Sequence, residues 1–165
     1  MAISSTDLKV YLSGGGSNTD PDLSLGGAIS STLAGTDLFD DVSASEASAG
    51  DTEYRAVYVK NTNATDSAYV TKIWVQTNTP SSSSAVTIAL AGEGASATIE
   101  TVTNESTAPS GESFSTAENE AAALSIGTLA PGAYYGVWIK RVITAGATSY
   151  ANDTFTLRVK ADTTT

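Results

Sequence analysis

The stretch from Leu129 to Ile143, which reads LAPGAYYGVWIKRVI, constrains the fold more than any other. It begins with a Leu-Ala-Pro-Gly turn and continues as a run dense in Tyr, Val, Trp and Ile. Successive side chains of a strand point to opposite faces, and in this run both faces are apolar. One face carries Tyr134 and Trp138, and the other carries Tyr135, Val137, Ile139 and Ile143. The stretch therefore predicts a central strand in a sheet that is covered on both sides.

Seven further segments have the alternation or the β-branched composition of strands. They are residues 7–13, 53–60, 69–77, 85–90, 97–102, 121–126 and 153–160. Counted from residue 50 onward, this gives a body of about seven or eight strands separated by turns. The spacing predicts an all-β fold, an antiparallel β-sandwich of immunoglobulin-like or jelly-roll-like type, with a closed barrel as the main alternative. The Leu-Ala-Pro turn followed by aromatic residues also resembles the tyrosine corner of immunoglobulin-like sandwiches.

The strand pattern also suggests how neighbouring strands pair. We expect residues 69–77 to form a hairpin with 53–60, and residues 153–160 to pair antiparallel with the central strand. The sequence Gly92-Glu93-Gly94 is expected to turn residues 85–90 back into 97–102.

Between residues 18 and 50 the strand pattern weakens, and isolated apolar residues stand in a background of Gly, Ser and Asp. These anchors are Leu23, Leu25, Ile29, Leu33, Leu38, Phe39 and Val42. We interpret the segment as an irregular extended arm with one or two short strands and one helical turn at residues 44–49. The predicted organisation is an N-terminal strand plus arm over residues 1–50 and a sandwich body over residues 51–165, or one continuous domain.

Histidine and cysteine are both absent from the 165 residues. Without histidine the chain lacks the commonest general base and cannot form a Ser-His-Asp triad. Without cysteine it has no disulfide or thiolate metal site, which fits folding in a reducing cytosol. It contains neither a nucleophile elbow nor a phosphate-binding loop, and no spacing brings a carboxylate pair together for glycoside hydrolysis. The sequence predicts a protein that is not an enzyme and holds no cofactor.

Charge further limits the possible partners, because the chain has 18 acidic and 8 basic residues and a net charge of −10. Such a surface repels phosphate, which argues against nucleic acid as a partner. The N-terminus has no charged region followed by an apolar one, and no apolar run reaches a membrane-spanning length. We therefore expect neither a signal peptide nor a membrane partner.

Three groups of residues are candidates for binding sites. Asp37, Asp40, Asp41, Glu46, Asp51 and Glu53 offer oxygen ligands for Ca²⁺, but they lack the spacing of an EF-hand loop, which favours a solvated loop. Trp74 and Trp138 could stack on a sugar, although their β-branched neighbours favour core packing. Lys140 and Arg141 could face an acidic partner, or one could point to solvent while the other lies along the sheet edge.

Two blocks of sequence carry a family resemblance. The first comprises SLGGAISS (24–31), LFDDV (38–42), AGDTEYR (49–55) and VKN (59–61). The second comprises VWIKR (137–141), TAGA (144–147) and FTLRV (155–159), and NESTAPSG (104–111) lies between the two. Together they resemble a group of small structural proteins from the virions of tailed bacteriophages, over residues from about Leu23 to Asp162.

The resemblance implies a structural role, foremost that of a capsid decoration or cement protein made in the host cytoplasm and carried on the capsid surface. Its expected partners are the major capsid protein and copies of itself, in a homo-oligomer for which a trimer is one arrangement. The residues expected to contact partners are the seven arm anchors Leu23, Leu25, Ile29, Leu33, Leu38, Phe39 and Val42, together with Lys140 and Arg141. Alternatives are a tail, neck or fibre component, with or without an adhesion role, and, in another class, a free carbohydrate- or metal-binding module.

Overall fold

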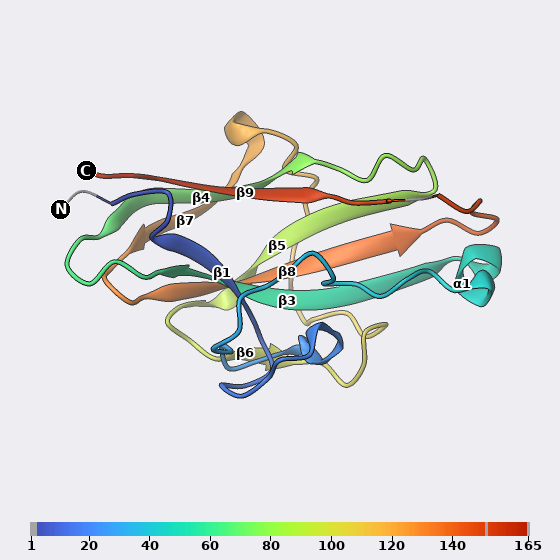
Figure 1. Cartoon of the computed structure of the whole chain (residues 1–165), viewed down its shortest axis with the longest axis horizontal. Coiled ribbons are helices and arrows are strands. Elements are labelled where there is room, and N and C mark those ends of the chain that lie inside the picture. The colour runs from blue at the N-terminus through green and yellow to red at the C-terminus, as the bar shows by residue number, and fades with distance from the viewer. Residues whose placement is uncertain (1–2, 151, 165) are drawn as a thin grey trace.

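The computed structural model describes residues 3–150 and 152–164. Strands make up 42% of the chain and helices 7%, and nine strands within the described ranges form antiparallel sheets. Figure 1 shows two sheets packed against each other, with the arm on the outer side of one of them. The predicted all-β sandwich is therefore confirmed, and the sheets are separate rather than closed into a barrel. Residues 1, 2, 151 and 165, which belong to the predicted ranges 1–50 and 51–165, lie outside the described residues.

The larger sheet has the order β1-β3-β8-β5, and every neighbouring pair is antiparallel. Its strands are β1 (Leu8–Leu12), β3 (Asp51–Asn61), β8 (Tyr134–Ile143) and β5 (Ser84–Ala95). Strand β8 lies between β3 and β5, as predicted for the central strand. Tyr135, Val137 and Ile139 face the core between the two sheets, whereas Tyr134 and Trp138 face a second core on the opposite side. Both faces of β8 are covered, which explains why its sequence is apolar at both parities.

The smaller sheet has the order β7-β4-β9, formed by β7 (Leu124–Leu129), β4 (Ala68–Thr77) and β9 (Thr156–Asp162). Two predicted pairings are therefore wrong. Strand β4 does not form a hairpin with β3, and β9 pairs with β4 rather than with the central strand. The chain changes sheet between β3 and β4 and again between β8 and β9. Alternation along a strand determines which residues face the core, but it does not determine which strand lies alongside.

A third pairing also differs from its prediction. Strand β5 does not turn back at Gly92–Gly94 but continues to Ala95, with a register shift against β8 after Leu90. The next strand, β6 (Ile99–Thr101), pairs with β2 (Gly26–Gly27) of the arm. The glycines that resemble a turn instead accompany an irregularity within a long strand.

The arm lies along the body and is hydrogen-bonded to it. Its 30–34 segment runs beside β1, where the backbone N–H of Leu12 donates to Thr32 and that of Ala34 donates to Val10, each over 2.9 Å. Nearer the start of the arm, the carbonyl of Ser24 accepts a hydrogen bond from the N–H of Ala56 in β3 over 2.7 Å. The arm also contains η1 (Pro21–Leu23) and the predicted single helical turn, which is α1 (Ala44–Ala49); a third short helix, η2 (Glu120–Ala122), precedes β7.

The seven arm anchors divide into two groups. Leu38 is buried in the core between the sheets, and Phe39 packs against it; Leu25 and Ile29 pack against the second core. Leu23, Leu33 and Val42 are exposed, at 59%, 50% and 41% of their surface. Four anchors therefore fix the arm to its own chain, and three face solvent.

Candidate functional site

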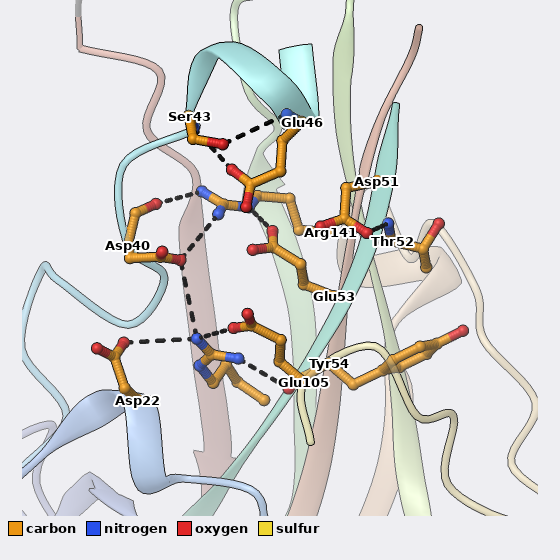
Figure 2. Close-up of polar contacts among 11 residues, drawn as sticks. Asp22, Asp40, Ser43, Glu46, Asp51, Thr52, Glu53, Tyr54, Glu105 and Arg141 are labelled. Atoms are coloured by element: carbon orange, nitrogen blue, oxygen red, sulfur yellow. Dashed lines mark hydrogen bonds and ion pairs between the residues drawn. The ribbon is translucent and has the colours of Figure 1, made fainter. Parts of the chain in front are cut away.

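Six charged residues from four parts of the chain meet beneath the arm, and we call them the carboxylate–arginine cluster. They are Asp22 and Asp40 of the arm, Glu53 and Arg55 of β3, Glu105 of the loop after β6, and Arg141 of β8 (Figure 2). Glu53 and Arg55 are two residues apart on one strand, so their side chains share a face. Glu53 is paired with Arg141 across β3 and β8, which places the two side chains opposite each other.

Arg55 is the cation at the end of the cluster nearest η1, and its side chain is 1% exposed. Its Nη2 donates to Glu105 Oε2 over 2.5 Å and to Asp22 Oδ1 over 3.4 Å. The same nitrogen lies 3.8 Å from Asp40 Oδ1. A buried guanidinium is costly unless it is paired, and here carboxylates of the arm and of the 102–120 loop pair with it. Arg55 therefore ties two irregular segments to β3.

Arg141 is the cation at the other end, nearest α1. Its Nε donates to Glu53 Oε2, and its Nη1 donates to the backbone carbonyl of Asp40 over 2.9 Å. Its Nη2 also donates to Asp40 Oδ1, over 3.4 Å. Asp40 is thus placed between the two guanidinium groups, and Figure 2 shows its carboxylate facing both.

The ring of Phe39 completes the contact between the arm and the two arginines. The guanidinium carbons of Arg55 and Arg141 lie 5.4 Å and 4.7 Å from its centroid. The ring of Phe39 also packs edge-on against the ring of Phe155, with the two centroids 6.2 Å apart. Cation–π contacts of this kind are more favourable when the cation is desolvated, as Arg55 is. One arm residue therefore contacts both the charged cluster and the apolar core.

Glu53 has the most unusual electrostatic environment in the cluster. Its side chain is fully buried, and its Oε1 accepts no hydrogen bond from any residue that the structure describes. Burial raises the pKa of this carboxyl, the hydrogen bond and charge of Arg141 oppose that rise, and the nearby carboxylates of Asp40 and Glu105 add to it. Glu53 is thus a buried acid with one oxygen paired and the other unpaired.

The raised pKa of Glu53 predicts how its contribution to stability changes with pH. A carboxyl whose pKa is higher in the folded state stabilises the fold below its ordinary value of 4.5, and this stabilisation is lost as the pH rises through the folded pKa. In buffer containing a chelator, we expect the wild type to gain stability relative to Glu53→Gln as the pH falls toward 4.5. Chemical denaturation of both proteins across the pH range measures this difference.

Glu120 provides a control of opposite sign, because the hydrogen bond and charge of Lys160 lower its pKa. A carboxyl with a lowered pKa stabilises the fold above its ordinary value, and this stabilisation is lost as the pH falls. The wild type should therefore lose stability relative to Glu120→Gln on acidification. Slopes of the same sign for the two variants would contradict the environment described for Glu53.

Of the acidic residues considered for Ca²⁺, the structure brings Asp40 and Glu53 together. Glu46 instead belongs to the capping box of α1 with Ser43, and Asp51 accepts from the N–H of Thr52. Sequence reasoning missed Asp22 and Glu105 as members of the same site, and it did not single out Arg55. An Arg within the apolar strand sequence YRAVYV was the available signal, because a charge in such a run must be paired.

The remaining predicted site residues have other surroundings. Arg141 is directed into the cluster, and the Nζ of Lys140 lies 5.1 Å from the ring of Phe114. Trp138 is fully buried and Trp74 is 6% exposed, which confirms core packing for both indoles. Their faces are therefore not available for stacking on a sugar.

No protein family, no curated protein and no solved structure matches the chain. Among residues 3–150 and 152–164, no helix has both the length and the apolar character needed to cross a membrane.

Proposed function

We propose that this chain is a structural protein of a tailed-bacteriophage virion, which decorates the capsid by binding the lattice of the major capsid protein. The proposal rests on the resemblance of the two sequence blocks together with the construction of the arm. The first block covers the strand β2 and three members of the carboxylate–arginine cluster, Asp40, Glu53 and Arg55. Part of the resemblance therefore falls on residues that build the arm or hold it to β3.

The observation that carries the proposal is the exposure of apolar residues on the arm. Five large apolar side chains are exposed in the described part of the chain, and Leu23, Leu33 and Val42 of the arm are three of them. Single exposed apolar residues are common, whereas an apolar patch is typical of a contact surface, and the proposal is that the arm supplies such a patch to the lattice. We assign these three residues to contact with the lattice, and the buried Leu38 to packing within the chain.

The way the arm is held supports this assignment. Hydrogen bonds to β1 and β3, together with the carboxylate–arginine cluster, fix its backbone before any partner is present. A surface that is already ordered loses less conformational entropy on binding than a disordered one. Repetition on a symmetric lattice would then multiply a modest affinity for each site.

The test is association with purified particles of the virus that carries this sequence. Deleting residues 20–42 would remove buried Leu38 and two members of the cluster, so point variants are more informative. We expect the triple variant Leu23→Ser, Leu33→Ser and Val42→Ser to bind particles at least ~10-fold more weakly in co-sedimentation, because each lost apolar contact is worth about 1 kcal/mol. Val70→Ser on β4, which is also exposed, is the matched control and should bind normally.

Copy number separates the capsid from other positions in the particle. A protein on the capsid lattice should be present in on the order of hundreds of copies, whereas six to a few dozen, roughly, would indicate the tail or neck. Electron cryo-microscopy of the particle would locate the chain directly. Unchanged binding of the triple variant would contradict the arm as the contact surface, and absence of the chain from the particle would contradict the virion role.

A further inference from the structure

We propose that Asp40, Glu53 and Glu105 bind a divalent cation, with Ca²⁺ as the best match. One oxygen from each of these three carboxylates lies within 4.8 Å of the others. Ca²⁺ binds oxygen at 2.3–2.6 Å, so two of its ligands are at most about 5 Å apart, and the separations of the three oxygens lie within this limit. The ligands come from the arm, from β3 and from the 102–120 loop, and Ca²⁺ tolerates the irregular geometry of such a set.

The unpaired oxygen of Glu53 is the observation that points to a ligand. Its carboxylate is fully buried, and Oε1 has no hydrogen-bond partner in the described part of the chain. In Figure 2 the oxygen of Glu53 that carries no dashed line points toward the side on which Asp40 lies. A buried, unpaired carboxylate oxygen carries a large desolvation cost, which a bound cation removes.

The charge of the cluster agrees with a divalent ion. Asp22, Asp40, Glu53 and Glu105 are four carboxylates against the two guanidinium groups of Arg55 and Arg141, which gives a formal charge of −2 when all are ionised. The arginine hydrogen bonds use Oδ1 of Asp40 and Oε2 of both glutamates. The second oxygens, Oδ2 of Asp40 and Oε1 of both glutamates, are therefore outside these arginine hydrogen bonds.

One edge of the site opens to solvent at Asp40. A surface hollow of about 1450 Å³ lies between the arm, α1 and the residues after β8, and Asp22, Asp40 and Arg141 border it. Asp40 and Glu105 are partly exposed, which leaves room for water to complete the coordination shell. A cation bound here would join the arm and the 102–120 loop to β3, and this inference does not depend on the virion role.

The test is a Ca²⁺ titration of the whole chain after removal of metal with a chelator, followed by calorimetry and thermal unfolding. We expect saturable binding in the range of about 10⁻⁶ to 10⁻³ M, with a rise in the unfolding temperature. Glu105→Gln and Asp40→Asn, at partly exposed positions, should weaken binding at least ~10-fold, and Glu53→Gln should do the same if it folds. Asp37→Asn, on the same arm but outside the cluster, is the matched control and should bind as the wild type does.

Three results would overturn the proposal. The first is no heat and no thermal shift up to about 10 mM Ca²⁺. The second is weak binding that Asp37→Asn reduces as much as Glu105→Gln does, which would indicate general attraction to an acidic surface. The third is Ca²⁺ binding that Glu105→Gln and Asp40→Asn leave unchanged, which would place the ion elsewhere.

Discussion

Replacing Arg55 with alanine is expected to lower the free energy of unfolding by about 3–5 kcal/mol, the usual cost of removing one partner from a buried ion pair. The guanidinium is 1% exposed and is paired with Glu105, Asp22 and Asp40. Without it, the charge of the remaining cluster becomes more negative around the buried Glu53. For a chain of this length each kcal/mol shifts the unfolding temperature by about 2–4 °C, so a decrease on the order of 10 °C is expected.

The matched control is Arg158→Ala on β9. Arg158 is exposed, and its Nη1 donates to Gln76 over 3.3 Å. An exposed arginine with such a contact contributes less than about 1 kcal/mol. Urea denaturation of the two variants measures both effects, and hydrogen exchange of residues 20–42 and 103–110 shows whether the arm and the loop are released. Equal losses of stability in the two variants would contradict the structural role assigned to Arg55.

Replacing Gly26 with alanine is expected to detach the strand β2 from β6. Gly26 has φ +92°, a conformation in which an L side chain costs about 1–3 kcal/mol. A Cβ at this position would also overlap the backbone carbonyl oxygen of Glu100 and crowd the ring of Trp138. Because the first obstacle is backbone, no rotamer change relieves it, and we expect a further cost of about 1–3 kcal/mol.

Gly15→Ala separates these two costs. Gly15 has φ +103°, but no atom lies within 4 Å of the position that its Cβ would occupy. The variant should therefore show the conformational cost without the overlap. Thermal unfolding measures the loss of stability in each variant, and limited proteolysis shows whether the arm is detached. If Gly15→Ala were as destabilising as Gly26→Ala, close packing of the arm on β6 would not be the cause.

These two predictions concern different attachments of the same arm. The Gly26 variant affects the backbone pairing of β2 with β6 over the second core, whereas the Arg55 variant affects the charged contacts of Asp22 and Asp40. The two attachments belong to one continuous segment, because Gly26 lies between Asp22 and Asp40 in the chain. If the arm folds onto the body as one unit, the double variant should cost less than the sum of the two single variants.

Local pattern was sufficient to identify most of the strands. The two apolar faces of β8 divide between the two cores as its alternation predicts, and β9 alternates between half-buried and exposed positions from Thr156 to Lys160. The single turn of α1 was also predictable, because Ser43 and Glu46 have the spacing of a capping box. These features depend on residues within a few positions of one another.

The sequence by itself therefore determined the all-β class and the central place of β8, because side-chain alternation is a local property. Only the tertiary structure decided that β4 and β9 belong to the second sheet, since the choice of partner depends on packing between distant segments. The carboxylate–arginine cluster was beyond sequence reasoning for the same reason. Arg55 pairs with Asp22 and Glu105, which are 33 and 50 residues away in the sequence, and no local pattern indicates such long-range ion pairs.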